Sequence, residues 1–245
     1  MAVKSTSQPP TLTRERIVQL AIEHADGRGL EHVTMRKLAG ELTVTPMALY
    51  WHFSNRDALL DAMAEEVAGQ LTYQDRLEAS WQDRLRAVLT AILGLLRDHP
   101  WLGPVARHRI VSAPNFLKVL EVLLDTLRAA GYDPQAAASV ADLTIDSLAA
   151  MAAEFPAATI REPKPRSPSE GQLRMRQKLD DLDGSEYPRI LEAAVPLTTP
   201  DSADGFLELG LDILIGGVDS AAPGSGPKVV PGDRPNRTGK SGSAP

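Results

Sequence analysis

The chain contains no cysteine. This absence excludes disulfide bonds, thiolate-ligated zinc, iron–sulfur clusters and cysteine nucleophiles. No apolar run reaches the roughly 18 residues of a membrane span, and the N-terminal segment MAVKSTSQPPTLT lacks the apolar core of a signal peptide. We therefore expect a soluble cytoplasmic protein without a membrane partner.

Short motifs of helical and nucleotide-binding enzymes are also missing. Glu-x-x-His, His-Glu-x-x-His, Gly-x-Ser-x-Gly and Gly-x-Gly-x-x-Gly do not occur. Residues 238–241 match only the end of a phosphate-binding loop, without its first glycine or a preceding strand. The five histidines share no spacing typical of metal ligands. These absences predict a protein that is not an enzyme and requires no cofactor and no metal.

The chain does hold enough apolar residues for one sizeable core and a small second one. Of its 245 residues, 43% are hydrophobic and 24% are charged, as in globular proteins. Only 4% are aromatic, so the cores must be built mainly from Leu, Val, Ile and Ala. The net charge is −6, yet residues 1–60 carry seven basic against six acidic side chains. A slightly basic head on an acidic body is compatible with phosphate contact at one end.

The two ends and one internal segment have the composition of loops. Residues 1–12 are polar and include Pro9 and Pro10, so we expect a disordered arm. Residues 221–245 are rich in Pro, Gly and Ser and are expected to form a disordered tail. Four prolines between Phe155 and Gly171 predict a mobile loop.

Between these loops the pattern is helical, and no segment shows the alternation of a strand. Apolar residues recur three and four apart in residues 81–97, 114–130 and 202–218, and residues 134–155 are rich in alanine. The stripes are Trp81, Leu85, Val88, Leu89, Ile92 and Leu96; Leu117, Leu120, Leu124 and Leu127; and Phe206, Leu209, Ile213 and Leu214. Ser80 is placed to cap the first of these helices, and Gly131 to end the second. We predict an all-α fold.

The first sixty residues divide into short helices with clear boundaries. One runs from about Thr13 to the glycines at 27–29, and a second, capped by Thr34, covers residues 35–42. A third covers residues 46–52 after Thr45, and Ser54 is expected to cap a fourth. This spacing is that of a helix-turn-helix, in which the second helix enters the major groove. A plain three-helix bundle fits the periodicity equally well. A helical adaptor that binds only protein is the main alternative function, and a helical-bundle enzyme is a more remote one.

The segment TMRKLAGELTVTPMALYWHFSNRDALLDAM resembles the DNA-binding domain of the TetR (tetracycline repressor) family. The matching positions are Thr34, Arg36, Leu38, Ala39, Val44, Leu49, Tyr50, His52, Phe53 and Leu59. Residues 80–86 and 206–220 are similar to stretches of that repressor's regulatory domain. The resemblance implies a helix-turn-helix DNA-binding domain at 13–60 and a helical regulatory and dimerisation domain at 61–220. Thr43 stands where the family usually has glycine, so we expect strain in that turn.

Binding of double-stranded operator DNA is what the resemblance implies for this head. Thr34 and Lys37 would contact phosphate at a helix N-terminus. Arg36 can bridge O6 and N7 of guanine, and we expect it to carry most of the hydrogen-bonded base specificity. The predicted DNA-binding residues are Thr34, Arg36, Lys37, Thr45, Pro46, Met47, Ala48, Tyr50, His52, Asn55 and Arg56.

The resemblance further implies a ligand-responsive transcriptional regulator, most simply a repressor, that reads a palindrome as a homodimer. Dimerisation is expected through about 134–155 and 202–219, where Gly205, Gly210, Gly216 and Gly217 would permit close approach. The polar positions that chelate tetracycline with magnesium are mostly apolar here, with Ala106 at the expected metal-binding histidine. We therefore expect a different small-molecule effector. Its predicted contacts are Trp81, Val88, Ile92, Trp101, Arg109, Leu120, Leu123, Asp146, Met151, Glu154 and Phe155, with His99, His108 and Asp142 as further polar options.

Overall fold

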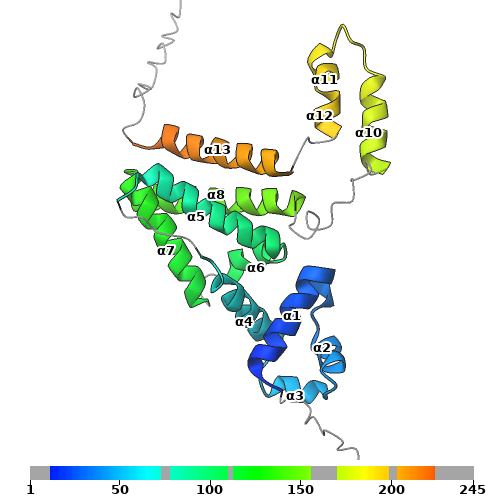
Figure 1. The fold of residues 1–245 in the computed structure, drawn as a ribbon, viewed down its shortest axis with the longest axis vertical. Helices are drawn as coiled ribbons and strands as arrows, with labels where there is room; N and C mark the ends of the chain where they lie inside the picture. The colour runs from blue at the N-terminus through cyan, green and yellow to red at the C-terminus, as the bar shows by residue number, and fades with distance from the viewer. Residues whose placement is uncertain (1–11, 73–77, 110–112, 156–169, 199–202, 224–245) are drawn as a thin grey trace, which may run out of the picture.

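The computed structural model describes residues 12–72, 78–109, 113–155, 170–198 and 203–223, and most of the predicted arm, of the tail and of the 155–171 loop lies outside them. The described residues form helices and no strand, so the predicted all-α fold is confirmed (Figure 1). The helices are α1 (Arg14–Arg28), the 3-10 turn η1 (Leu30–His32), α2 (Met35–Glu41), α3 (Pro46–Tyr50), α4 (Arg56–Ala68), α5 (Trp81–Asp98), α6 (Leu102–Arg109), α7 (Pro114–Ala129), α8 (Pro134–Glu154), α10 (Glu170–Asp180), α11 (Pro188–Glu192), α12 (Ala194–Thr198) and α13 (Ala203–Ala221).

Helices α1 to α3 form the head, and its boundaries follow the side chains that satisfy helix ends. The Thr13 hydroxyl accepts a hydrogen bond from the Arg16 N–H, and Gly29 ends α1 at φ +91°. The core beneath α1, α2 and α3 is apolar apart from the buried His24 of α1. Its largest members are Ile17, Leu38, Leu49, Phe53 and Leu59.

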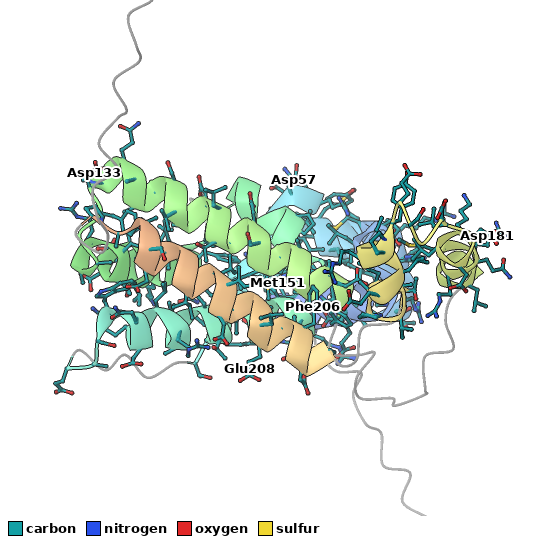
Figure 2. All side chains as sticks on the ribbon, turned by 90° about the horizontal axis from the view of Figure 1, so that it is seen from above. Asp57, Asp133, Met151, Asp181, Phe206 and Glu208 are labelled. Carbon is teal, nitrogen blue, oxygen red and sulfur yellow. The ribbon has the colours of Figure 1, made fainter. Side chains whose placement is uncertain are left out.

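The body packs α5, α7 and α8 against one another, and α13 lies across α5 and α8 (Figures 1 and 2). The apolar face of α5 is buried as its periodicity predicts. On its other side, α5 is joined to α13 by polar contacts: Gln82 donates to Asp219 at 3.1 Å, Arg86 pairs with Asp212, and Arg97 lies 3.7 Å from Asp204.

Helix α4 belongs to both parts of the molecule. It packs against α1 in the head and against α6 and α7 in the body. The Glu65 carboxylate accepts the N–H of Asn115 at 2.8 Å and so satisfies the start of α7. The predicted domain boundary at residue 60 therefore falls inside a continuous helix. Helices α10 to α12, which follow α8 and precede α13 in the chain, pack on one another in a hairpin that stands apart from the other helices in Figure 1.

Three local predictions need correction. Asn55, rather than Ser54, is the N-cap of α4, because its side chain accepts the Ala58 N–H at 2.8 Å. The predicted loop cannot extend to Gly171, because α10 begins at Glu170. Most of the apolar stripe expected on α13 lies outside the core of this chain, and of its four residues only Leu214 is half-buried against that core. The buried residues of α13 are Leu207, Leu211, Ile215 and Val218, whereas Phe206, Leu209 and Ile213 are exposed.

Candidate nucleic-acid interface and ligand cavity

The turn between α2 and α3 determines how α3 is presented. The Val44 N–H donates to the Ala39 carbonyl at 3.0 Å, and the Thr43 N–H donates to the Gly40 carbonyl at 3.2 Å. This pair of bonds defines a Schellman motif, which needs a left-handed residue just after the helix. Thr43 fills that position with φ +58°. The strain expected at Thr43 is therefore present.

Helix α3 lies at the end of the molecule farthest from α13 (Figure 1). Leu49 is fully buried beneath it, whereas Met47, Tyr50 and Trp51 are 66%, 47% and 85% exposed. Large apolar side chains exposed together on one surface mark a binding site. The sequence prediction did not include Trp51, because the periodicity of a five-residue helix does not reveal which way the residue after it points.

The other predicted DNA contacts share this accessibility. None of the eleven residues is buried. Exposed members are Arg36, Lys37, Thr45, Pro46, Met47, Tyr50, Asn55 and Arg56, and half-buried members are Thr34, Ala48 and His52. The structure thus brings residues from α2, α3 and the start of α4 to the surface of one small head.

Two threonines occupy the N-cap positions of the two helices. The Thr34 hydroxyl accepts the Lys37 N–H at 3.3 Å, as predicted for the cap of α2. Thr45 has the extended backbone of an N-cap, but its side chain makes no capping hydrogen bond. Its hydroxyl is therefore open to an outside partner such as a DNA oxygen.

Arg56 has a structural role within the head. Its Nε donates to the carbonyl of Val33 and its Nη2 to the carbonyl of Leu30, both at 2.9 Å. These bonds attach the start of α4 to η1, the segment that leads into α2. The direct contact of Arg56 with DNA stays a prediction, while its hydrogen bonds hold the segment that directly precedes α2.

Two further contacts hold the head helices together. The Arg14 guanidinium donates to the carbonyl of His52 at 3.2 Å and lies 4.3 Å from the centre of the Phe53 ring, so it ties α1 to the end of α3. His24 Nε2 and a Glu41 carboxylate oxygen lie 2.7 Å apart and join α1 to α2. This hydrogen bond lowers the pKa of Glu41. These contacts join α1 to α2 and to the end of α3.

The body contains an apolar cavity of about 50 Å³ between α4, α5, α6, α7 and α8. Its lining residues are Ala68, Leu71, Ile92, Leu95, Leu96, Leu102, Gly103, Phe116, Val119, Leu120 and Ile145. No charged or hydrogen-bonding side chain is among these described residues. Sites for drug-sized ligands measure roughly 300–1,000 Å³, so such a ligand requires these helices to separate. Ala68 and Leu71 place the end of α4 in the cavity wall.

The cavity includes Ile92 and Leu120 from the predicted ligand contacts. Val88 and Leu123 are fully buried in the surrounding core but do not line it. Arg109 and His108 have side chains outside the described part of the structure. The other lining residues were not predicted, because they come from five helices and no local pattern links them.

Several predicted ligand contacts lie instead on α8 or at its C-terminal end, and two of them, Met151 and Phe155, lie against α13. Figure 2 places Met151 and Phe206 in the same part of this helix pair. Phe155 packs on Phe206 with ring centroids 5.1 Å apart, and Glu154 is exposed. Trp81, Asp142 and Asp146 also lie outside the cavity lining. Their contact with a ligand stays a prediction.

A second apolar surface follows the outer side of α8 and α13. Leu143, Phe206, Leu209 and Ile213 are 68%, 43%, 59% and 63% exposed. Between the helices lies an open groove of about 230 Å³. It is lined by Tyr132, Val140, Leu143, Thr144, Ser147, Ile213, Leu214, Gly217, Val218 and Ala221. Exposed apolar area of this kind is typical of an interface between proteins.

The glycines of α13 have different surroundings. A Cβ added to Gly210 would lie 2.3 Å from the Met151 side chain of the same chain, so Gly210 allows α13 to approach α8. A Cβ added to Gly216 or Gly217 would meet nothing within 4 Å. These two positions leave open backbone beside the groove, as close contact with another helix requires.

Two further features concern metal binding and membrane insertion. Among the described residues, no group of three His, Asp or Glu side chains is placed to hold a metal ion. Helix α8 is long and apolar enough to cross a membrane by length and composition, with a mean hydropathy of 1.3. It packs on α5 and α7 through one face, however, and core helices of soluble proteins can have the same length and composition.

Comparisons with known proteins match both parts of the molecule. Residues 17–63 match the family described as bacterial regulatory proteins, tetR family, and residues 75–221 match the tetracyclin repressor-like C-terminal domain. An HTH-type transcriptional regulator from Saccharopolyspora erythraea is 34% identical over 151 residues, 60% of this chain and 64% of that relative. The HTH-type transcriptional repressor DrrR1 from Streptomyces coeruleorubidus is 33% identical over 138 residues, 56% of this chain and 51% of that relative. The chain thus spans about half to two thirds of the length of these two relatives.

A solved structure extends the likeness over most of the chain. The Streptomyces coelicolor TetR family protein ActR, in complex with actinorhodin, superposes with a TM-score of 0.71. The sequence identity is 29%, and the match covers 86% of this chain and 99% of that one.

Proposed function

The chain belongs to the TetR family of transcriptional regulators, which are DNA-binding proteins and not enzymes, and on that premise we propose that it is a repressor. In this proposal it binds a palindromic operator as a homodimer in the bacterial cytoplasm. A small molecule other than tetracycline then enters the body and releases the DNA. The head at 13–60 reads the operator, and the remainder up to 220 dimerises and binds the effector.

The exposure of α3 is the observation that carries the DNA-binding proposal. Met47 and Tyr50 on this short helix and Trp51 directly after it stay exposed in the described part of the chain, although burying them would stabilise the fold. Arg36 and Lys37 extend the same end of the head with two cations. A groove lined by phosphates and thymine methyl groups fits this combination of apolar and basic side chains.

The surface of α8 and α13 supports the homodimer. A single head reads too few base pairs to find one site in a genome, and a two-fold dimer doubles the length of sequence read. The exposed Leu143 and Ile213, the groove between them and the open backbone at Gly216 and Gly217 give a surface that a second copy can cover. The repressor role is supported by the relative described as a repressor.

The chemistry of the cavity supports an effector unlike tetracycline. A metal-chelated drug carries charge and many hydrogen-bonding groups, and burying these against hydrocarbon costs several kcal/mol. The described lining offers only apolar side chains and Gly103. We infer that the effector presents a largely apolar, uncharged surface to this cavity and binds without a metal.

Selection of bound fragments from random and genomic DNA tests the DNA-binding proposal. The wild-type protein should enrich a palindrome, and Tyr50→Ala should abolish the enrichment. Tyr187→Ala is the matched control, because Tyr187 is also an exposed tyrosine but lies on the hairpin of α10 to α12, away from the head. If wild-type protein enriches no sequence and its affinity for DNA does not fall with salt, the chain is a protein-binding adaptor instead.

Two measurements test the rest of the proposal. A reporter gene behind the selected operator should be repressed by the wild-type protein. A thermal-shift screen should find uncharged, largely apolar compounds that raise the melting temperature and restore reporter expression. Stabilisation only by tetracycline with magnesium would contradict the inferred effector chemistry.

A further inference from the structure

Head and body meet at three side chains that belong neither to the DNA-binding surface nor to the cavity lining. Asp26 lies in the last turn of α1, and His99 and Trp101 lie in the turn between α5 and α6. The Trp101 indole N–H donates to Asp26 Oδ1 at 2.7 Å. His99 Nδ1 lies 2.9 and 3.0 Å from the two Asp26 oxygens. Because a carboxylate only accepts hydrogen bonds, His99 Nδ1 carries the donated proton.

The environment of this cluster makes it an ordered contact. Trp101 is 6% exposed, and the side chains of His99 and Asp26 are 12% and 30% exposed. The His99 and Trp101 rings meet edge to face, with centroids 6.2 Å apart. Hydrogen bonds to a charged acceptor are stronger than neutral ones, and partial burial reduces competition from water. The cluster therefore holds α1 at a defined position on the body.

Both hydrogen-bond donors of this cluster are next to the cavity wall in the chain. Trp101 directly precedes Leu102 and Gly103, which line the cavity from the first turn of α6. His99 follows Leu96, which lines it from α5, by three residues. A displacement of the first turn of α6 must therefore move the Trp101 indole relative to Asp26.

We propose that Asp26 is the positioning residue through which the cavity controls the orientation of the DNA-binding head. This regulation rests on the function proposed above. A ligand that enlarges the cavity moves the first turn of α6, and Trp101 then withdraws its N–H from Asp26. The end of α1 is released, and α2 and α3 move with it because Arg14 and the His24–Glu41 contact bind them to α1. Helix α4 remains as the covalent connection between the two parts.

A substitution inside the cavity wall replaces the unidentified effector in the test. A Cβ added to Gly103 would lie 2.9 Å from the Cβ of Ala149 on α8. Gly103→Ala therefore forces α6 away from α8, as an entering ligand would. The assay measures affinity for the selected operator in full-length protein carrying Gly103→Ala, Asp26→Asn or both, since a double-mutant cycle isolates the coupling between two positions.

The expected result is a strong non-additivity. Gly103→Ala should weaken operator binding by about fivefold or more in the otherwise unchanged chain, within the usual range of allosteric coupling. In the Asp26→Asn background the same substitution should change binding less than about twofold. Glu23→Gln is the matched control, because it removes one exposed carboxylate from the same helix and should leave the full effect of Gly103→Ala. Equal effects of Gly103→Ala in all three backgrounds would overturn the proposal.

A second cavity-wall variant and an NMR measurement give an answer even if Gly103→Ala does not fold or no operator is found. If Gly103→Ala does not fold, Ala149→Val adds volume at the same crossing from α8. The chain has three tryptophans, so a ¹⁵N-labelled sample gives three indole N–H signals, of which Trp101→Phe identifies one. Asp26→Asn and the folded cavity-wall variant should each shift the Trp101 signal and speed its exchange with water. An unchanged signal in the cavity-wall variant would overturn the positioning role even if no operator is ever found, whereas failure to select an operator would overturn only the proposed function.

Discussion

Replacing Thr43 by glycine should stabilise the head without removing a predicted DNA contact. Thr43 is exposed and sits at φ +58° in the Schellman motif that ends α2. The same chain ends α7 with the same pair of hydrogen bonds, from the Gly131 N–H to the Arg128 carbonyl and from the Tyr132 N–H to the Leu127 carbonyl. There the left-handed residue is glycine, at φ +95°. Two equivalent turns therefore differ in whether a Cβ is present.

The magnitude follows from two opposing effects. A residue with a Cβ pays about 1–2 kcal/mol in the left-handed region. Glycine loses more backbone entropy on folding, which offsets about 0.5–1 kcal/mol. Thr43→Gly should therefore raise the free energy of unfolding by roughly 0.5–1 kcal/mol. For a chain of this size, that corresponds to a rise of roughly 1–4 °C in the melting temperature.

Thermal unfolding followed by circular dichroism, with Thr43→Ala alongside, separates the two effects. Alanine keeps the Cβ and should melt within about 2 °C of the wild type, since a change that leaves the strain in place stays within about 0.5 kcal/mol. Operator affinity should be unchanged in both variants. If Thr43→Gly melts at or below the temperature of Thr43→Ala, backbone strain at this turn is not a source of instability.

Three further outcomes are expected. Arg36→Ala should weaken operator binding by about 1–3 kcal/mol and relax one base position in each half-site. Binding measurements on operator and on random DNA check this, because an equal loss of affinity for both would exclude base reading by Arg36. The Tyr132 hydroxyl donates to the buried Val218 carbonyl at 2.6 Å, so Tyr132→Phe should cost about 1–3 kcal/mol in denaturant unfolding. Burial raises the pKa of Tyr132 from its ordinary 10.0, so folding favours the protonated hydroxyl. The resulting stabilisation is complete below pH 10.0 and is lost as the pH rises through the pKa of the folded state. The phenylalanine variant should not show this loss. Leu143→Glu should convert a dimer to a monomer in light scattering, and a variant that remains dimeric would place the interface elsewhere.

The helix boundaries were predictable from residues that act locally. Thr34 and Ser80 accept the backbone N–H groups that their sequence positions suggest, and Gly131 ends α7 at positive φ. The one wrong cap arose where two cap-forming residues, Ser54 and Asn55, are adjacent. Only the extended backbone at residue 55 decides between them.

Features that depend on tertiary packing were not predictable from these patterns. Helix α13 carries two apolar stripes, and the sequence does not say which one packs on its own chain. Leu207 and Leu211 are buried, while Leu209 and Ile213 are left at the surface. The residues that line the cavity could not be predicted either, since they come from five helices. The contact of Asp26 with Trp101 spans 75 positions of the chain, and no local spacing indicates it.

Hydrogen–deuterium exchange of the full-length protein, with and without the selected operator duplex, tests the central claim most directly. If α2, α3 and the start of α4 lie on DNA, backbone amides between residues 34 and 56 should become protected when the duplex is added. The hairpin formed by α10 to α12 should exchange at the same rate in both samples. Protection that appears only outside residues 34–56, with the amides of α3 unchanged, would contradict the account.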